Sequence, residues 1–177
     1  MISEITVSPR PSNNKARHLF FILMILAVTA AAVYLSIPNY KGIIGLVCLV
    51  FIFAAIYIYN RYMATKYYYD VMLDASGTPL FLVRSVVGKR ATTLCRVELS
   101  SIIGITAITA EERKNHKAPD GFVKYYYAPT MGPDRITLVT VSSRYERAEI
   151  SIEVSDEFIT LLTSYVKEAR EFHVEEE

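Results

Sequence analysis

The sequence predicts a membrane hairpin of two α-helices followed by a small α+β domain. Two long uncharged runs, residues 19–37 and 42–59, each approach the roughly 20 apolar residues that a helix needs to cross a membrane. From about Lys66 the pattern changes to short alternating strands, and the chain closes with one amphipathic helix. We therefore expect a disordered basic tail at 1–18, a transmembrane hairpin at 19–62 and a cytoplasmic domain at 66–174.

The two apolar runs have the character of an anchor and not of a channel. Neither contains Asp, Glu, Lys, Arg or His, whereas a transport path or proton relay normally shows such a group within the membrane. The first run is also longer than the core of a signal peptide, which is about 7–15 residues, and a second apolar run follows at once. We expect both runs to stay in the protein as a hairpin.

Basic residues flank the hairpin and are scarce in its turn. Arg10, Lys15 and Arg17 precede the first run, and Arg61 and Lys66 follow the second. The turn between the runs contains only Lys41. Cytoplasmic flanks collect Lys and Arg, so we expect a multi-pass protein of the plasma membrane with both termini cytoplasmic. Aromatic and basic side chains mark the headgroup level, and those expected at the membrane interface are Tyr57, Tyr59, Arg61, Tyr62 and Lys66.

Charge and cysteine content exclude several classes of function. From Lys66 onward there are 14 Lys and Arg against 17 Asp and Glu, a net charge of −3, which argues against a nucleic-acid partner because phosphate binding needs a basic surface. The two cysteines, Cys48 in the second apolar run and Cys95 in an expected strand, form neither a disulfide framework nor a zinc motif. Two buried thiols in a reducing compartment are the interpretation we favour.

Period-two alternation and turn residues divide the domain into strands. Strands are expected at 67–74, 79–87, 90–99, 102–109, 122–127, 135–141 and 148–154. Gly77 can supply the positive φ of the first turn, and residues 110–121 are expected to be a polar loop. In the last strand Ala148 and Ile150 are expected to point inward, and Glu149 outward.

A final helix is expected at 156–172. Ser155 can cap it, and Asp156 and Glu157 complement the helix dipole in the first turn. Seven apolar residues fall on one face at helical spacing and should cover the sheet: Phe158, Leu161, Leu162, Tyr165, Val166, Ala169 and Phe172.

The strand series 67–154, the link Leu99-Ser100-Ser101-Ile102 and the helix at 156–172 resemble the pleckstrin-homology-like (PH-like) domain, in its bacterial membrane-anchored version. The resemblance implies a seven-stranded antiparallel roll, or partly open barrel, capped by the C-terminal helix. A generic small α+β roll with a covering helix is the alternative.

The resemblance also raises the question of whether the domain binds anionic lipid headgroups. Some relatives carry a basic cluster at the turn between the first two strands, but the turn at 75–78 is uncharged here. A second basic group, around the next hairpin, is the candidate headgroup site: Arg84, Lys89, Arg90 and Arg96. Ordinary solvent-facing charge is the competing interpretation.

Three consecutive tyrosines form the candidate partner-binding site. Tyr125, Tyr126 and Tyr127, followed by Met131, place rings on both faces of an expected strand, so that one face is buried and the other is available to a protein. Tyrosine is also a good strand residue, and packing within the core is the alternative.

The sequence offers no catalytic motif. We find no nucleophile elbow, no zinc-protease motif and no phosphate-binding glycine loop, and no histidine has a companion at metal-ligand spacing. We expect no catalytic, cofactor-binding or metal-binding residues. The expected function is a non-enzymatic membrane-anchored adaptor or regulatory subunit with a membrane-proximal protein partner; the alternative is a lipid or membrane-state sensor. The oligomeric state is left open.

Overall fold

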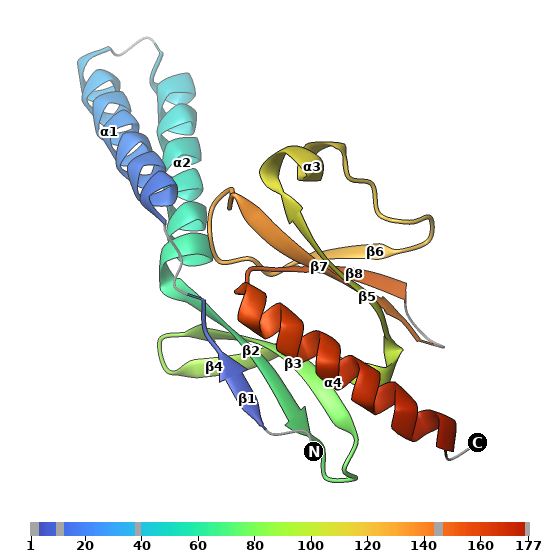
Figure 1. Ribbon diagram of the computed structural model, residues 1–177. Coiled ribbons are helices and arrows are strands. Elements are labelled where there is room, and N and C mark those ends of the chain that lie inside the picture. The colour runs from blue at the N-terminus through green and yellow to red at the C-terminus, as the bar shows by residue number, and fades with distance from the viewer. Residues whose placement is uncertain (1–3, 10–12, 38–39, 144–146, 176–177) are drawn as a thin grey trace. The chain divides into compact units, whose positions relative to one another are not determined.

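The computed structural model describes the chain except for residues 1–3, 10–12, 38–39, 144–146 and 176–177 (Figure 1). The chain divides into two compact units, a helical unit (Pro11–Thr65) and a sheet-containing unit (Met1–Arg10 with Lys66–Glu177). The second unit is therefore built from two pieces of chain that lie on either side of the first unit in the sequence. Each unit is described by itself.

The helical unit is a hairpin of α1 (Asn14–Ser36) and α2 (Lys41–Ile58), which continues into a π-helical turn, η2 (Tyr59–Ala64). The first helix begins at Asn14, earlier than expected. Small side chains lie where the helices meet: Ala27 and Ala55 are buried, and the Cys48 thiol donates to the carbonyl oxygen of Ala27 at 3.5 Å. Small residues let helix backbones approach closely.

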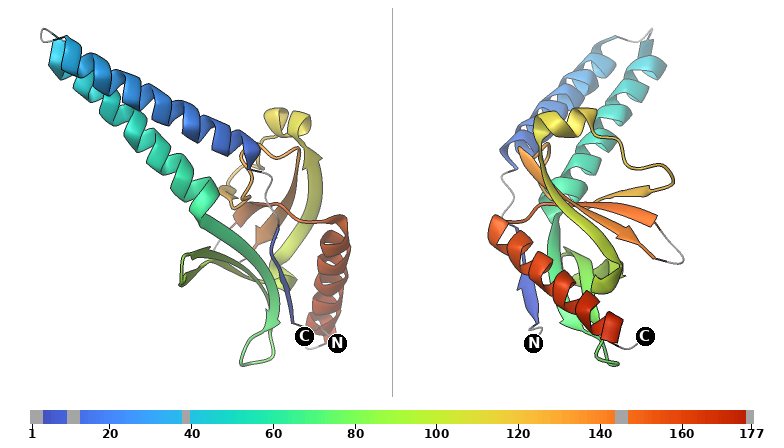
Figure 2. Two further views of the ribbon diagram at one scale, coloured as in Figure 1. Left: turned by 90° about the vertical axis from the view of Figure 1, so that its left-hand side faces the viewer. Right: turned by 45° about the vertical axis from the view of Figure 1, so that its right-hand side comes forward.

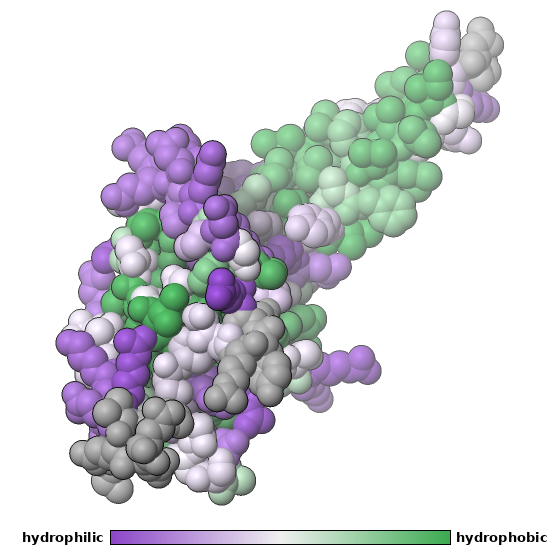
Figure 3. Space-filling view, turned by 90° about the vertical axis from the view of Figure 1, so that its right-hand side faces the viewer, coloured by the Kyte–Doolittle hydropathy of each residue, from purple (hydrophilic) through white to green (hydrophobic). Residues whose placement is uncertain are grey.

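Both helices are long and apolar enough to cross a membrane, and few of their apolar residues are buried. Large side chains exposed along them include Phe21, Ile22, Ile25, Val28, Leu35, Ile43, Leu46, Val50, Phe53 and Tyr57. Figure 3 shows the visible side of the hairpin as a largely apolar surface. A helix in the core of a water-soluble protein would bury such a surface, so this exposure favours contact with lipid.

The second unit contains two four-stranded sheets. The first has the order β1-β2-β3-β4 and the second β5-β7-β8-β6. The strands are β1 (Ile5–Val7), β2 (Thr65–Leu73), β3 (Pro79–Val87), β4 (Arg90–Glu98), β5 (Ile102–Thr109), β6 (Val123–Tyr126), β7 (Arg135–Ser142) and β8 (Arg147–Ile152). A 3₁₀ turn, η3 (Leu99–Ser101), carries the chain from the first sheet into the second.

This arrangement corrects the expected seven-stranded antiparallel roll. The described part of the chain has eight strands in two sheets, and β6 pairs with β8 in parallel, with Val123 opposite Ala148 and Tyr126 opposite Ser151. The eighth strand, β1, comes from the segment expected to be a disordered tail. It pairs antiparallel with β2, with Ile5 opposite Val71. The remainder of that tail also differs, since residues 14–18 belong to α1.

The main core lies between the two sheets and is closed by α4 (Asp156–Glu175), which runs along one side of them (Figures 1 and 2). Phe158, Leu162, Val166 and Ala169 are buried on the face that the sequence predicts. The Ser155 hydroxyl accepts from the amide of Phe158, which confirms the expected cap. The α+β class and the covering helix are thus confirmed.

A second, smaller core lies on the opposite face of the second sheet. It consists of Ile108, Ala128, Ile136 and Leu138. Ile136 and Leu138 alternate along β7 with the main-core residues Val139 and Val141, so they point to the other face. The expected loop at 110–121 contains a helix, α3 (Ala110–Asn115), which follows β5. The outer face of this sheet is therefore partly covered and not simply solvated.

Candidate binding cleft

A cleft of about 940 Å³ lies between β4 and the second sheet. Its lining comes from β4, η3, β6, β7 and β8 and from the single residues that follow β6 and β7: Leu94, Cys95, Arg96, Val97, Glu98, Ser101, Tyr125, Tyr127, Val141, Ser142, Ser143, Ala148 and Ile150. This volume is near the upper end of the roughly 300–1,000 Å³ typical of ligand pockets. All of these residues belong to the sheet-containing unit.

One wall of the cleft is an edge strand. In the sheet order β4 is the last strand, and its register with β3 is given by pairs such as Phe81 with Val97 and Val83 with Cys95. A β-bulge interrupts this register next to Cys95. Beyond the bulge, from Cys95 to Glu98, β4 runs regularly along the cleft. An edge strand is a template for pairing with another extended chain.

The facing wall carries two tyrosine rings. Tyr125 and Tyr127 stack with their centroids 6.0 Å apart and their planes within 6° of parallel. The Tyr127 hydroxyl donates to the carbonyl oxygen of Leu94 at 3.5 Å, which spans the cleft from the second sheet to the first. Of the residues predicted to bind a partner, Tyr125 and Tyr127 therefore line the cleft.

The other two predicted partner-binding residues lie elsewhere. Tyr126 alternates to the opposite face, where the Arg113 guanidinium donates to its hydroxyl at 3.5 Å. Met131 is half-buried in the loop after β6 and is not part of the cleft lining. The tyrosine triplet thus has rings on both faces, as strand alternation predicts.

Two charged residues of β4, Arg96 and Glu98, line the cleft. Arg96 donates from Nη2 to Oδ2 of Asp74 at 2.6 Å. The hydroxyl and amide of Ser76, followed by Arg96, lower the pKa of the half-buried Asp74 carboxyl. Arg96 and Glu98 are both exposed and, being two residues apart, project from the same face of β4.

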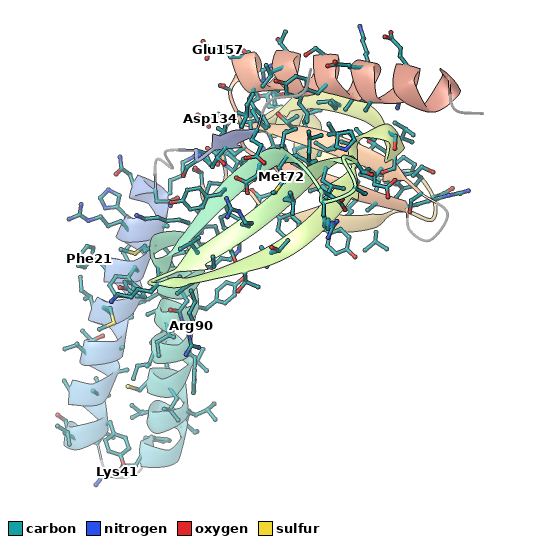
Figure 4. The ribbon with its side chains drawn as sticks, turned by 90° about the horizontal axis from the view of Figure 1, so that it is seen from below. Phe21, Lys41, Met72, Arg90, Asp134 and Glu157 are labelled. Carbon is teal, nitrogen blue, oxygen red and sulfur yellow. The ribbon has the colours of Figure 1, made fainter. Side chains whose placement is uncertain are left out.

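Of the four residues predicted to bind lipid headgroups, Arg84 and Arg96 form ion pairs within the domain. Arg84 pairs with Asp70, which is 3% exposed and also accepts from the Thr6 hydroxyl at 2.7 Å. The Asp70 carboxylate raises the pKa of the Arg84 guanidinium. Arg96 pairs with Asp74, as above. Lys89 and Arg90 are exposed at the β3–β4 turn, and Figure 4 shows Arg90 at the end of that hairpin.

Tyr69 positions the tyrosine wall from within the core. It is fully buried, and its hydroxyl donates to the carbonyl oxygen of Tyr127 at 3.0 Å while accepting from the amide of Glu153 at 3.3 Å. One side chain of the first sheet thereby fixes the ends of both β6 and β8. The Tyr127 amide, in turn, donates to the carbonyl of Ser151.

A buried pair outside the cleft was not expected from the sequence. Glu149, expected to point outward, does alternate away from the main-core residues Ala148 and Ile150, but it is 3% exposed, and its Oε2 lies 2.7 Å from Nε2 of His116. It is buried because His116, in the loop after α3, covers it. The only sequence signal for that cover is the capping box Thr109-Ala110-Glu111-Glu112, in which Thr109 and Glu112 bond reciprocally.

The residues predicted for the membrane interface lie at the end of the hairpin and the start of β2. Tyr57 and Tyr59 are exposed, and the Tyr59 ring lies 5.9 Å from that of Phe20. The Arg61 guanidinium lies 5.4 Å from the ring centroid of Tyr62. Lys66 is exposed in β2. At the other end of the hairpin, Lys41 lies over the ring of Tyr34, and Figure 4 shows Lys41 beside the helix–helix turn.

No family model, curated protein or solved structure matches the chain. Within the described residues no three His, Cys, Asp or Glu side chains are grouped so that they could hold a metal ion. The cleft and the apolar hairpin are therefore the features that indicate a function.

Proposed function

We propose that the protein is a non-enzymatic, membrane-anchored adaptor or regulatory subunit whose cytoplasmic, PH-like domain binds a protein in the cleft beside β4. The observation that carries the proposal is the cleft itself. It joins an edge strand to a wall of two stacked tyrosines, and aromatic residues are enriched at protein interfaces.

The hairpin supports a two-span anchor with both termini on one side of the plasma membrane. The pairing of β1 with β2 requires the chain before α1 and the chain after α2 to meet in one sheet. A membrane crossed twice allows this, whereas one crossed once does not. The basic flanks then favour the cytoplasmic side.

The join between the units supports a partner close to the bilayer. No residue separates η2 from β2, so the domain has little reach from its anchor. Confinement to a surface raises the effective concentration of a membrane-proximal partner, so that a weak intrinsic affinity suffices.

A matched pair of leucines tests the site. Leu94 and Leu73 are 39% and 40% exposed on strands of the same sheet, but only Leu94 lines the cleft. Partners would be crosslinked to the full chain in native membrane discs and identified by mass spectrometry. Leu94→Arg should reduce recovery of a reproducible partner at least tenfold, and Leu73→Arg should leave it unchanged. Equal recovery from both variants would reject the cleft as the binding site.

Lipid sensing is the second candidate, carried by the exposed pair Lys89 and Arg90 at the β3–β4 turn. The pairing of Arg84 and Arg96 with carboxylates makes it weaker than the adaptor proposal. It requires that anionic lipid in the disc slow hydrogen exchange around this turn, and that high salt remove the effect. Equal exchange in anionic and zwitterionic discs would eliminate it.

A further inference from the structure

We propose that a second copy of this chain closes the cleft, through antiparallel pairing of β4 with β4 of the other copy about a two-fold axis at Val97. The inference rests on the membrane anchor of the proposed function but not on its partner protein, because it assigns another occupant to the same edge. It also adds a consequence: the self-paired form and the partner-bound form exclude each other.

The first support is the regular stretch of edge strand. β4 is the last strand of its sheet, and the bulge next to Cys95 bends the strand and disturbs its register there. In antiparallel pairing about Val97, Cys95 would lie opposite Leu99, which is fully buried in η3, so the paired stretch is Arg96–Glu98. The adjacent cleft of about 940 Å³ leaves room beside this stretch for a strand.

The second support is charge complementarity that only one register provides. In antiparallel pairing about Val97, Arg96 of each copy lies opposite Glu98 of the other, so two opposite-charge pairs form at once. Centring the pairing on Arg96 would place Arg96 opposite its own copy, and centring it on Glu98 would do the same with a carboxylate. Like charges directly opposite are destabilising.

The existing bond of Arg96 is compatible with this pairing. Arg96 contacts Asp74 through Nη2, and a guanidinium has five N–H donors. It can therefore hold Asp74 within its own chain and Glu98 of the other copy together. Attachment to one membrane also concentrates the two copies on a surface, which favours association through a short stretch of strand.

Charge exchange tests the register. The full chain, carrying two different affinity tags, would be reconstituted in liposomes and scored for co-purification of one tag with the other. Arg96→Glu alone and Glu98→Arg alone should each reduce self-association at least tenfold, because every cross-strand pair then has like charges. Mixing these two variants should restore association between them, and the double variant should self-associate as the native chain does.

A thiol at the axis gives a second readout. In a Cys48→Ala, Cys95→Ala background, Val97→Cys should form a covalent dimer under mild oxidation, because residues opposite each other in antiparallel strands have Cα atoms about 4.5–5.5 Å apart, within disulfide range. Val87→Cys, at an exposed valine of β3, is the matched control and should remain monomeric.

The charge variants decide whether β4 pairs with β4 of a second copy. Loss with the single charge variants and recovery in their mixture establish the pairing even if the Val97→Cys chain fails to fold. Self-association that is equally strong in both single variants, their mixture and the double variant overturns the pairing. Its absence from the native chain also overturns the pairing. Because the Leu94→Arg capture experiment scores a different protein, failure of the self-pairing leaves the adaptor proposal standing, and failure of the capture leaves the self-pairing standing.

Discussion

At the scale of single residues, the sheet-containing unit depends on a few polar side chains that join strands distant in sequence. Asp70 links three neighbouring strands through Thr6 of β1 and Arg84 of β3. Tyr69 links the two sheets through the ends of β6 and β8. Buried polar groups of this kind are stabilising only while all partners are present, since an unsatisfied buried group is costly.

Removal of one hydroxyl should therefore have a measurable cost. Tyr69→Phe leaves the Tyr127 carbonyl and the Glu153 amide without this partner, and we expect a loss of about 1–3 kcal/mol. Tyr126→Phe removes a hydroxyl on the more exposed side of β6 and should cost less than about 0.5 kcal/mol. Hydrogen exchange of β7 amides in membrane discs measures both; equal losses would contradict the role given to Tyr69.

Asp74 makes stability depend on pH in a defined direction. Its bonds to Ser76 and Arg96 lower its pKa in the folded state, so its contribution is present above the ordinary aspartate value, about pH 4, and is lost as pH falls through the lower folded value. The stability advantage of the native chain over Asp74→Asn should shrink as pH decreases from 6 toward 3. Thermal unfolding followed by circular dichroism measures it, and an advantage that grows on acidification would refute the assignment.

At the scale of elements, α4 holds the two sheets together over the main core. Leu162, on the inner face of this helix, is fully buried, whereas the preceding residue, Leu161, is only partly buried. Leu162→Ala should destabilise the domain by about 2–5 kcal/mol, and Leu161→Ala by clearly less, because the cost of a truncation grows with the cavity it leaves. Urea unfolding monitored by tyrosine fluorescence compares them. Similar losses at both sites would mean that the helix does not pack as described.

The elements that sequence could predict are those with local signals. An apolar run between turn residues predicts β3, and both β3 and β5 have the expected bounds to the residue. Gly77 adopts the positive φ expected of it, +82°. The stripe on α4 is equally local. In contrast, β1 has only three residues, too few to show a periodicity, and its partner strand lies beyond the whole hairpin in the sequence. The parallel pairing of β6 with β8 likewise depends on long-range packing.

The candidate site was predictable in part for the same reason. Alternation along Tyr125–Tyr127 shows that rings face both sides, but it does not say which side is a cleft. That assignment requires the position of β4, which is remote in sequence. The burial of Glu149 by His116 is also non-local, since a loop that looks merely polar covers a strand face.

At the scale of the whole molecule, the discontinuous domain constrains topology. If the two helices cross the membrane, Glu4 and the β2–β3 turn must be on one side and Gly42 on the other. In a chain without native cysteines, Glu4→Cys and Ser76→Cys should react with an impermeant maleimide only from the cytoplasmic side, and Gly42→Cys only from outside. Labelling of Glu4→Cys and Ser76→Cys from opposite sides would refute the proposed anchor.

The placement of β1 also dictates an order of events during biosynthesis. The ribosome makes Ile5–Val7 first, yet Tyr69–Val71, with which these residues pair, emerge only after the entire hairpin has been translated. The first sheet thus cannot be completed until both helices have been synthesised and, if they cross a membrane, inserted. Translocation of the leading segment would separate the two strands permanently, so correct insertion is a precondition for folding the domain and not merely for locating it.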